Sequence, residues 1–318
     1  MLLETQPWDK ARHISQSLEL AVLLEASASK PGNVNRTANF QSTRYEHFLA
    51  SAVALSHCFE HAAELGVAVS KGKIQVCNVG LGRIIKDCAV AVDAWQHGGN
   101  TLLGTAILLS PIAVAAGMTP TKQETFKVPE LRKNVKLAVE STTPEDAVNV
   151  YEAIKTAKPG GLGASSELDI NDPNSINRIR KEKISLYQIF KIAETYDMIC
   201  SEWINNYPVT FDIARPALMH QLEKDEDLGH AIVYTFLKVL AEYPDTLIAR
   251  KAGIEKAREA SKTAKEILRL GFETSSAKKL LDRFDKDLRK SGNLLNPGTT
   301  ADIIAAALAL IVLGGYRP

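Results

Sequence analysis

Apolar side chains recur at three- and four-residue steps along most of the chain, which is the spacing of amphipathic helices. The pattern is clear over residues 12–28, with Ile14, Leu18 and Val22, and it returns over residues 45–65. Alternating β-branched segments are nearly absent, and only residues 73–79 (KIQVCNV) could form a strand. The pattern therefore predicts an all-α fold of roughly ten to twelve helices, without an internal repeat.

Helix-boundary signals support this interpretation in the middle and the last third of the chain. Thr143 precedes Pro144 and two acidic residues, which predicts an N-cap and the first turn of a helix. Residues 245–270 are expected to form one long helix that ends at Gly271. Residues 277–290 follow as another, which ends at Ser291-Gly292.

Two segments, residues 101–117 and 300–314, are apolar on nearly every face and rich in alanine. Such helices are expected at the centre of a bundle, where small side chains allow neighbours to approach closely. A polar, glycine-containing turn precedes each, and a helix start of this kind can bind an anion through its free N–H groups. Simple N-capping, by Asn100 or Thr299, is the alternative interpretation.

Composition and charge narrow the class of protein. Of 318 residues, 45% are hydrophobic and 24% charged, which is enough apolar material for a large core. The 38 basic and 37 acidic side chains leave a net charge of +1, so no global field favours nucleic acid or anionic lipid. Four dispersed cysteines argue against a zinc ribbon or a disulfide framework. No apolar stretch reaches the ~18–20 residues of a membrane span, and no linker divides the chain, so we expect a soluble, cytoplasmic protein with a single domain over residues 1–318.

The segment after the first helix is rich in candidate ligands. Pro31-Gly32 fits a type II turn, a rigid bend that would project the polar side chains around it. Those side chains are Lys30, Asn33, Asn35 and Arg36. Two cations with amide donors suit a polyphosphate.

Two further motifs could carry chemistry. The loop with Gly160, Gly161 and Gly163 is followed by Glu167 and Asp169, and it could hold a metal–phosphate or simply be mobile. His57, Glu60 and His61 match the H-x-x-E-H pattern, in which two histidines on one helix face can chelate zinc, although a third ligand is not evident. An ordinary histidine pair on an amphipathic helix is the simpler interpretation of the second motif.

Four glycine-containing elements occur in a characteristic order. They are Lys30-Pro31-Gly32, Gly99-Asn100-Thr101…Gly104, Gly160-Gly161-Leu162-Gly163 and Asn296-Pro297-Gly298-Thr299-Thr300-Ala301-Asp302. Together they resemble the triphosphoribosyl-dephospho-coenzyme A synthase family, in particular its archaeal branch, over about residues 15–315. The resemblance implies an all-helical fold. It also implies a reaction in which ATP donates its 5-triphosphoribosyl group to the ribose 2′-hydroxyl of 3′-dephospho-coenzyme A and adenine is released.

These motifs supply candidate site residues. Asp302 begins an apolar helix, where an isolated carboxylate needs a partner, so it is the first candidate for a magnesium ligand or general base. Plain interaction with the helix dipole is the alternative role. Glu25 is a weaker catalytic candidate, and Glu167 and Asp169 are weaker metal ligands. The expected ATP- and substrate-binding residues are Lys30, Asn33, Asn35, Arg36, Asn100, Thr101, Gly104, Gly161, Gly163, Thr299 and Thr300.

The chain departs from the bacterial pattern at two places. Leu102-Leu103 replaces a His-Lys pair after Asn-Thr, and Asn35 stands where the bacterial Pro-Gly-Leu-Val-Asp pattern has a carboxylate. Three functions therefore compete: a magnesium-dependent triphosphoribosyl transferase, a nucleotide- or coenzyme-binding protein without transfer activity, and a zinc hydrolase.

The expected partners are ATP and a dephospho-CoA-like small molecule, with neither nucleic acid nor a membrane, and a homodimer is left open. If both apolar helices enter the core from the same side, their polar starts converge. We therefore expect Asn100 and Asp302 to face one pocket together with the turn over residues 30–36, which we call the Lys30 turn.

Overall fold

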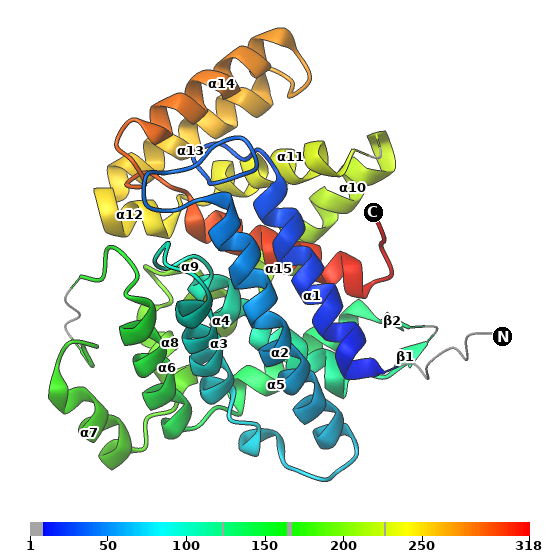
Figure 1. Ribbon diagram of the computed structural model, residues 1–318, viewed down its shortest axis with the longest axis vertical. Coiled ribbons are helices and arrows are strands. Elements are labelled where there is room, and N and C mark those ends of the chain that lie inside the picture. Colours follow the sequence, from blue (N-terminus) through cyan, green and yellow to red (C-terminus); the bar gives the residue numbers. More distant parts are fainter. Residues whose placement is uncertain (1–8, 123, 164–166, 226) are drawn as a thin grey trace.

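The computed structural model describes residues 9–122, 124–163, 167–225 and 227–318 (Figure 1). Helices dominate this part of the chain, and its only strands are two antiparallel strands of two residues each. The elements are α1 (Lys10–Ser27), α2 (Tyr45–Ser70), the 3₁₀ turn η1 (Val76–Asn78), α3 (Leu81–Trp95), α4 (Leu103–Met118), β1 (Thr121–Lys122), β2 (Thr125–Phe126), α5 (Val128–Glu140), α6 (Pro144–Ala157), α7 (Pro173–Glu182), α8 (Leu186–Ala193), α9 (Met198–Ile204), the π-helical turn η2 (Val209–Ala214), α10 (Arg215–Asp225), α11 (Leu228–Glu242), α12 (Thr246–Ala252), α13 (Ile254–Arg269), α14 (Ser275–Arg289) and α15 (Gly298–Leu313). The all-α expectation is confirmed, although the α-helices of the described residues number fifteen rather than ten to twelve.

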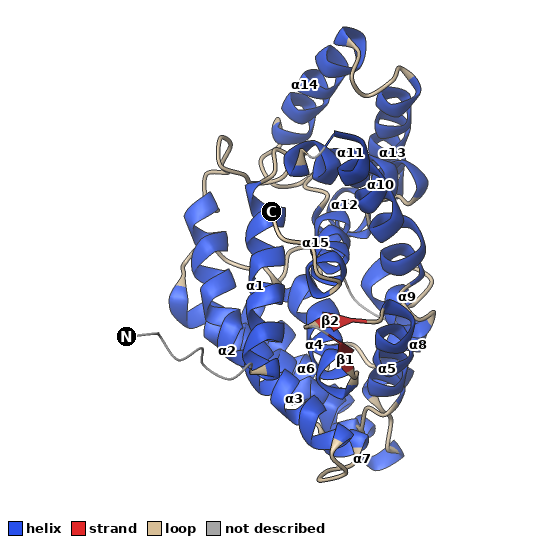
Figure 2. Ribbon diagram, turned by 90° about the vertical axis from the view of Figure 1, so that its right-hand side faces the viewer, coloured by secondary structure: helices blue, strands red, loops and turns tan. Residues whose placement is uncertain are grey.

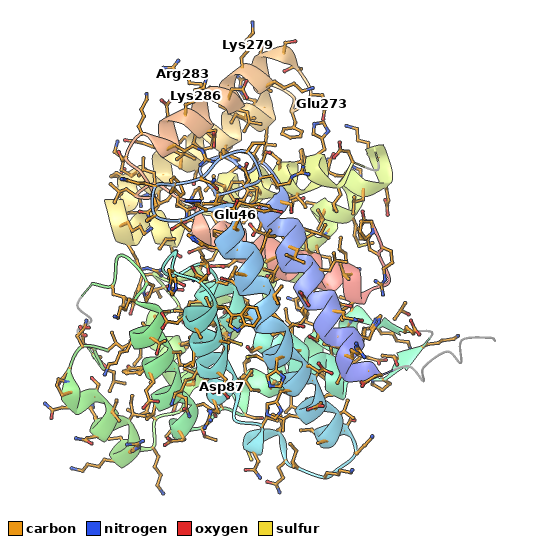
Figure 3. All side chains as sticks on the ribbon, viewed as in Figure 1. Glu46, Asp87, Glu273, Lys279, Arg283 and Lys286 are labelled. Atoms are coloured by element: carbon orange, nitrogen blue, oxygen red, sulfur yellow. The ribbon has the colours of Figure 1, made fainter. Side chains whose placement is uncertain are left out.

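The two apolar helices lie at the centre, as their composition predicts. Fourteen of the sixteen residues of α4 are buried, and thirteen of the sixteen in α15. Helices α1 and α2 lie side by side and cover this pair, while α3 packs on α6 (Figure 1). Figure 2 shows α13 and α14 at one end of the molecule, away from the small β-hairpin. Charged side chains such as Lys279, Arg283 and Lys286 cover the outer side of α14 (Figure 3).

Small residues allow α2 and α4 to cross backbone against backbone. A Cβ atom on Gly66 would lie 2.1 Å from the Val114 carbonyl oxygen, and one on Gly117 would lie 2.3 Å from the carbonyl oxygen of Ala63. Backbone atoms cannot move aside as a flexible side chain can. Glycine is therefore required on both helices at this crossing.

Pro111 interrupts the hydrogen-bond ladder in the middle of α4. A proline has no N–H, so the Ile107 carbonyl loses its usual donor within the helix. The indole of Trp203 donates to this carbonyl at 3.2 Å, and the hydroxyl of Tyr207 donates to the next one, Leu108, at 3.1 Å. Both aromatic side chains are almost completely buried. The region of α9 and η2 thus supplies the donors that the core helix lacks.

One local expectation is wrong, and one segment that could have formed a strand does not. Residues 245–270 form two helices, α12 and α13, because Gly253 adopts φ +91° and ψ 156° between them, a conformation outside the helical region. Residues 73–79 contain the η1 turn rather than a strand, since this short exposed segment pairs with no strand in the described part of the chain. The cap at Thr143 is confirmed, with Asp146 completing the reciprocal pair.

No helix within the described ranges is long and apolar enough to cross a membrane. The expectation of one domain over residues 1–318 stays a prediction.

Trp203→Phe should lower the free energy of unfolding, because the Ile107 carbonyl then lies buried without a donor. An unsatisfied buried carbonyl costs about 1–3 kcal/mol, in addition to the lost ring volume. In a Pro111→Ala background, the new N–H can pair with Ile107, so the same Trp203→Phe change should cost less by about that amount. Urea unfolding of the four proteins measures this coupling. Additive changes in the free energy of unfolding would show that the hydrogen bond from the Trp203 indole to the Ile107 carbonyl does not compensate for Pro111.

Candidate functional site

A cavity of about 370 Å³ lies where the starts of α4 and α15 meet. We call it the central cavity. Its walls come from the end of α1, the turn after it, the loop before α4, the loop after α6, and the segment before α15. Its polar and charged lining residues include Glu25, Asn33, Thr43, His97, Asn100, Thr101, Thr105, Lys158, Lys251, Asn293, Asn296 and Asp302, and its aromatic ones are Phe40 and Phe48. The expected convergence of Asn100 and Asp302 on one cavity is therefore found.

Asp302 contacts the first turn of α4 directly. The hydroxyl of Thr105 donates to Asp302 Oδ1 at 2.6 Å. A Cβ atom on Gly104 would lie 2.0 Å from Oδ2, so the glycine makes the room that this carboxylate occupies. The side chain of Asp302 thus lies at the positive end of α4, while its backbone belongs to α15, just after the first turn of that helix.

Burial raises the pKa of Asp302 to about 8. The hydrogen bonds from Thr105 act in the opposite direction, and the nearby carboxylates of Glu25 and Asp245 raise the pKa further. A carboxyl that titrates near neutral pH can exchange a proton under physiological conditions. Such a group is suited to general acid–base work.

Asp245 joins two helix starts, a role that the sequence analysis did not assign. Its Oδ1 accepts from the N–H groups of Leu247 and Ile248 at 2.9 and 3.0 Å, which caps α12. Its Oδ2 accepts from the N–H and the hydroxyl of Thr300 at 2.7 and 2.8 Å, which caps α15. Burial raises the pKa of this carboxyl, and those hydrogen bonds oppose the rise. An aspartate before a helix signals a cap, but the second helix it serves is 55 residues away.

The structure corrects the expected role of Lys30. Its ammonium lies 3.0 Å from Glu25 Oε1, donates to the carbonyls of Glu25 and Ala28, and is almost wholly buried. Glu25 lines the central cavity, whereas Lys30 lies behind it. Burial raises the pKa of Glu25, and the charge of Lys30 opposes that rise. Lys30 therefore balances a carboxylate, and its position does not offer it to a phosphate.

The other residues of this turn divide in the same way. Asn33 lines the cavity, its amide nitrogen donates to Asn296 Oδ1, and its own buried Oδ1 has no hydrogen-bond partner among the described residues. Asn35 instead folds back to accept from the N–H and hydroxyl of Thr37. Arg36 is exposed on the outer side, where its Nε donates to the Ser27 carbonyl at 3.2 Å. Asn35 and Arg36 are thus outside the cavity lining.

Helix α14 holds this turn in place. Asp285 accepts from the N–H of Gly32 at 2.8 Å and pairs with Arg289, whose Nε lies 2.8 and 2.9 Å from its two oxygens. Arg289 also donates to the Asn33 carbonyl and lies 5.3 Å from the centre of the Phe40 ring. Gly32 has φ +72° and packs against Leu288 so closely that a Cβ atom would lie 2.8 Å from Cδ1. The C-terminal half of α14 therefore positions two lining residues, Asn33 and Phe40.

The cations at the cavity come from elsewhere in the chain. Lys158 follows α6 in a left-handed conformation (φ +47°), and Lys251 lies near the end of α12. Both line the central cavity. Lys251 donates to the Asn293 carbonyl at 3.1 Å, and burial lowers its pKa. The sequence analysis assigned neither lysine to the site. Lys158 lies beside the glycine loop, which could have indicated it, whereas Lys251 lies within an ordinary helical pattern and carries no such signal.

The expected helix-start residues have mixed roles. The side chain of Asn100 accepts from the N–H of Leu103 at 3.1 Å, so it caps α4 and also lines the cavity. Thr101 and Gly104 also line the cavity, and the Thr101 hydroxyl lies 2.8 Å from that of Ser51. Thr299 and Thr300 are buried beneath the cavity, on Thr246 and Asp245 respectively.

The residues expected from the glycine loop are not brought to the cavity. Gly161 packs against the stem of Lys251, and neither it nor Gly163 belongs to the lining. Asp169 accepts from the Asn171 N–H, and neither Glu167 nor Asp169 belongs to the cavity lining that contains Asp302. Within the described ranges, no three His, Cys, Asp or Glu side chains are grouped to hold a metal. The metal set of Asp302, Glu167 and Asp169 is therefore not assembled, because the loop after α6 presents only its first residues to the cavity.

The zinc-hydrolase hypothesis is not supported. His57 and His61 are exposed on α2, and His61 lies 3.6 Å from Glu64 Oε2. In the described part of the chain, no third His, Cys, Asp or Glu side chain joins this motif to complete a metal site. The pair is an ordinary feature of an amphipathic helix.

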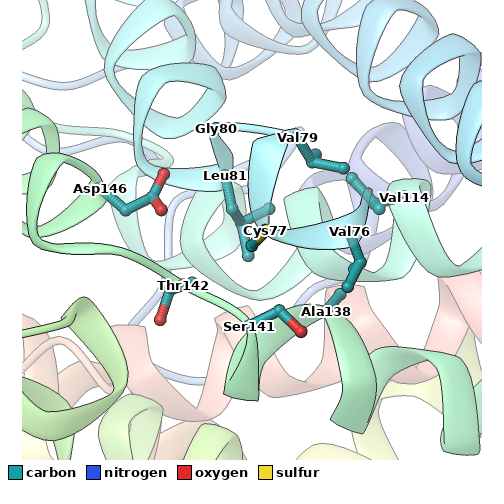
Figure 4. A pocket seen from close by; sticks show the side chains of 10 residues that line it. All are labelled: Val76, Cys77, Val79, Gly80, Leu81, Val114, Ala138, Ser141, Thr142 and Asp146. Atoms are coloured by element: carbon teal, nitrogen blue, oxygen red, sulfur yellow. The ribbon is translucent and has the colours of Figure 1, made fainter. Parts of the chain in front are cut away.

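Two other hollows border α3 and α4. A side chamber of about 160 Å³ adjoins the central cavity and shares with it the residues Gly99, Asn100, Leu102, Leu103 and Lys158. A second hollow lies between η1 and the corner before α6 (Figure 4), but its free volume for a water molecule is about zero. There Asp146 accepts from the N–H of Gly82 at 2.8 Å. That hollow is a packing seam rather than a ligand site.

Asp302→Asn should stabilise the protein increasingly as pH rises. The folded carboxyl keeps its proton up to about pH 8, whereas the unfolded one loses it near its ordinary value of 3.8. The native state therefore loses stability relative to the unfolded state as pH rises through this window, and an asparagine does not. Urea unfolding at pH 5 and pH 8, without divalent metal, should show a gap between the two proteins that grows with pH. A gap independent of pH would contradict the raised pKa.

Lys251→Gln should change phosphate binding, whereas Lys30→Gln should change the stability of the fold. Loss of the Lys251 charge should weaken tripolyphosphate binding by about 1.5–3 kcal/mol, as expected for a charge-assisted contact, with little change in stability. Lys30→Gln should instead destabilise the fold by about 3–5 kcal/mol, because Glu25 remains buried without its partner. Calorimetric titration and thermal unfolding separate the two outcomes. Arg36→Gln is the control and should change neither. Wild-type binding by Lys251→Gln would exclude it as a phosphate ligand.

Comparison with known proteins agrees with this architecture. No significant match is found among curated proteins. A crystal structure of a proposed triphosphoribosyl-dephospho-CoA synthase from Archaeoglobus fulgidus superposes with a TM-score of 0.60, at 20% identity, over 85% of this chain and 100% of that one, which shows a shared fold. The family model described as CitG, ATP:dephospho-CoA triphosphoribosyl transferase, matches residues 11–317. Since the match covers nearly the whole chain, this protein belongs to the ATP:dephospho-CoA triphosphoribosyl transferase family.

Proposed function

We propose that this protein transfers the 5-triphosphoribosyl group of ATP to the ribose 2′-hydroxyl of 3′-dephospho-CoA and releases adenine. Membership of the transferase family makes this the first function to test. The observation that carries the proposal is the central cavity, in which a carboxyl with a pKa of about 8 and two lysines line one space.

The reaction needs a proton acceptor and a site for a triphosphate. The C1′–N9 bond of ATP breaks with its electron pair leaving on adenine, and a new bond forms between C1′ and the acceptor oxygen. Asp302 is the proposed base that takes the proton of the 2′-hydroxyl, and the departing adenine takes up one proton, so that it leaves neutral and the protons balance. The raised pKa of Asp302, near the working pH, is the range in which such a group is most effective. Glu25, held by Lys30, adds negative charge beside an oxocarbenium-like ribose.

Lys158 and Lys251 are proposed to bind the triphosphate. The chain lacks the His-Lys pair of the bacterial motif, having Leu102-Leu103 instead. Leu102 and Leu103 line the cavity as apolar groups, so the loss of this pair leaves no cation at that wall. The two lysines on other walls supply positive charge of the same kind. Asn33, with its unpartnered buried oxygen, and Asn100 can then orient ligand hydroxyls.

The cavity lining offers few ligands to magnesium. Mg²⁺ in nucleotide sites is usually held by one or two carboxylates together with phosphate oxygens and water. Asp302 and Glu25 are the carboxylates of the central-cavity lining, and with Asp302 assigned to the proton transfer, Glu25 is the one that would hold the ion. When bound, the ion would neutralise phosphate charge. Glu167 and Asp169 are not part of this proposal.

A binding protein without transfer activity is the alternative, and the replaced His-Lys pair is the observation that favours it. Under either hypothesis the protein would bind ATP, but only a transferase would release adenine in the presence of an acceptor.

The purified protein, incubated with ATP, Mg²⁺ and dephospho-CoA, should release adenine and yield one triphosphoribosyl adduct of the acceptor per adenine. Asp302→Asn should lower kcat by about 10²–10⁴-fold, as expected when a general base is lost. Gly104→Ala should also lower kcat, since its methyl group displaces the Asp302 carboxylate while the helix itself tolerates alanine. Chromatography of adenine and mass spectrometry of the acceptor measure both products.

Asp282→Asn, an exposed change on α14, is the matched control and should retain wild-type kcat. ATP binding without adenine release under these conditions would favour the binding protein. Full activity of Asp302→Asn would remove Asp302 from the mechanism.

A further inference from the structure

We infer that the side chamber beside the central cavity binds the adenine base of the donor nucleotide and holds it as it leaves. This inference rests on the proposed function, because ATP is the proposed donor. The chamber wall is formed by α3, α4 and α6 and would receive the purine. The charged groups of the central cavity are proposed to contact only the phosphates and the reacting ribose.

The chamber has the size and lining for a flat ring system. Its volume of about 160 Å³ is below the ~300 Å³ of the smallest pockets for drug-sized ligands, so it suits a base but not a whole nucleotide. Most of its lining is apolar, and this part comprises Cys88, Ala89, Val92, Leu102, Leu103, Ala106 and Ala157. Asp93 and Thr156 add polar groups that can meet the edge of a purine. An apolar wall of this kind disfavours phosphate.

The shared rim explains how one ligand could occupy both spaces. Gly99, Asn100 and Lys158 border the chamber and the central cavity alike. A nucleotide with its base in the chamber would pass its ribose over this rim, so that C1′ lies between the base and the side that carries Asp302. Its triphosphate would then extend into the central cavity, where Lys251 lies. The bond that breaks would be at the boundary between the two spaces.

The acceptor is the competing occupant, and its shape argues against it. The pantetheine arm of dephospho-CoA is long and flexible, and it would fill a chamber of this size with only part of its length. The acceptor also carries an adenine, but Phe40 and Phe48 in the central cavity offer aromatic faces for stacking that base. The chamber has no aromatic side chain in its lining.

Filling the chamber tests the inference. Ala157→Leu, at the half-buried end of α6, places a larger side chain in the lining. The dissociation constant of ATP should rise by about 10- to 200-fold, the range for excess bulk in an apolar pocket, while that of tripolyphosphate stays within about twofold of wild type. Ala89→Val fills the chamber from α3 and should act in the same direction. Isothermal titration calorimetry with ATP, tripolyphosphate and free adenine gives all three affinities.

Ala94→Leu is the matched control, because it adds the same side chain on the exposed side of α3, outside the chamber lining. Unchanged ATP affinity in both filled variants would overturn the inference while leaving ATP as the donor. Weaker ATP binding in Phe48→Leu alone would place the donor base in the central cavity, which also overturns it. Absence of ATP binding by the wild-type protein would overturn the inference and the proposed function together.

Discussion

The backbone of α4 is buried along nearly its whole length, so each amide or carbonyl that the helix cannot pair must find a partner inside the protein. At its start, Asn100 and Asp302 meet the free end of the helix. In its middle, Trp203 and Tyr207 donate to the carbonyls that Pro111 disturbs. At its end, the ammonium of Lys10 donates to the carbonyls of Gly117 and Thr119, both at 2.7 Å. Elements from both ends of the chain are thereby fixed around one helix.

The same requirement creates the candidate site. Asp302 satisfies the start of α4 but remains a carboxyl in a poorly hydrated place, close to Glu25 and Asp245, and its pKa rises accordingly. An apolar residue would avoid this cost, yet it could not exchange a proton at neutral pH. The stability lost by the charged form and the chemistry proposed for Asp302 therefore have one cause. Active sites commonly show such a balance between stability and function.

The residues that give the Lys30 turn its polar character mainly build the wall of the cavity. Lys30 balances Glu25, Asn35 closes a local turn, and the pair of Asp285 and Arg289 fastens the backbone around Asn33. A rigid wall of this kind keeps Asn33 in a fixed position at low entropic cost to a ligand. The lysines that line the cavity are Lys158 and Lys251, which reach it from the ends of α6 and α12.

Local periodicity and the cost of exposing apolar helices were enough to predict the all-α class and the two central helices. The meeting of their polar starts was an expectation that required both helices to enter the core from the same side, and only the tertiary structure decided that. The order of motifs in the sequence also identified the family. The sequence could not separate Lys30, which is buried behind the cavity, from Lys251, which lines it, since both are simply basic residues on helical segments or their ends. Nor could it show that Gly253 divides a helix or that Asp245 caps α15 from 55 residues away. Those outcomes depend on which segments pack together, and burial, partner choice and pKa exist only once distant residues are in contact.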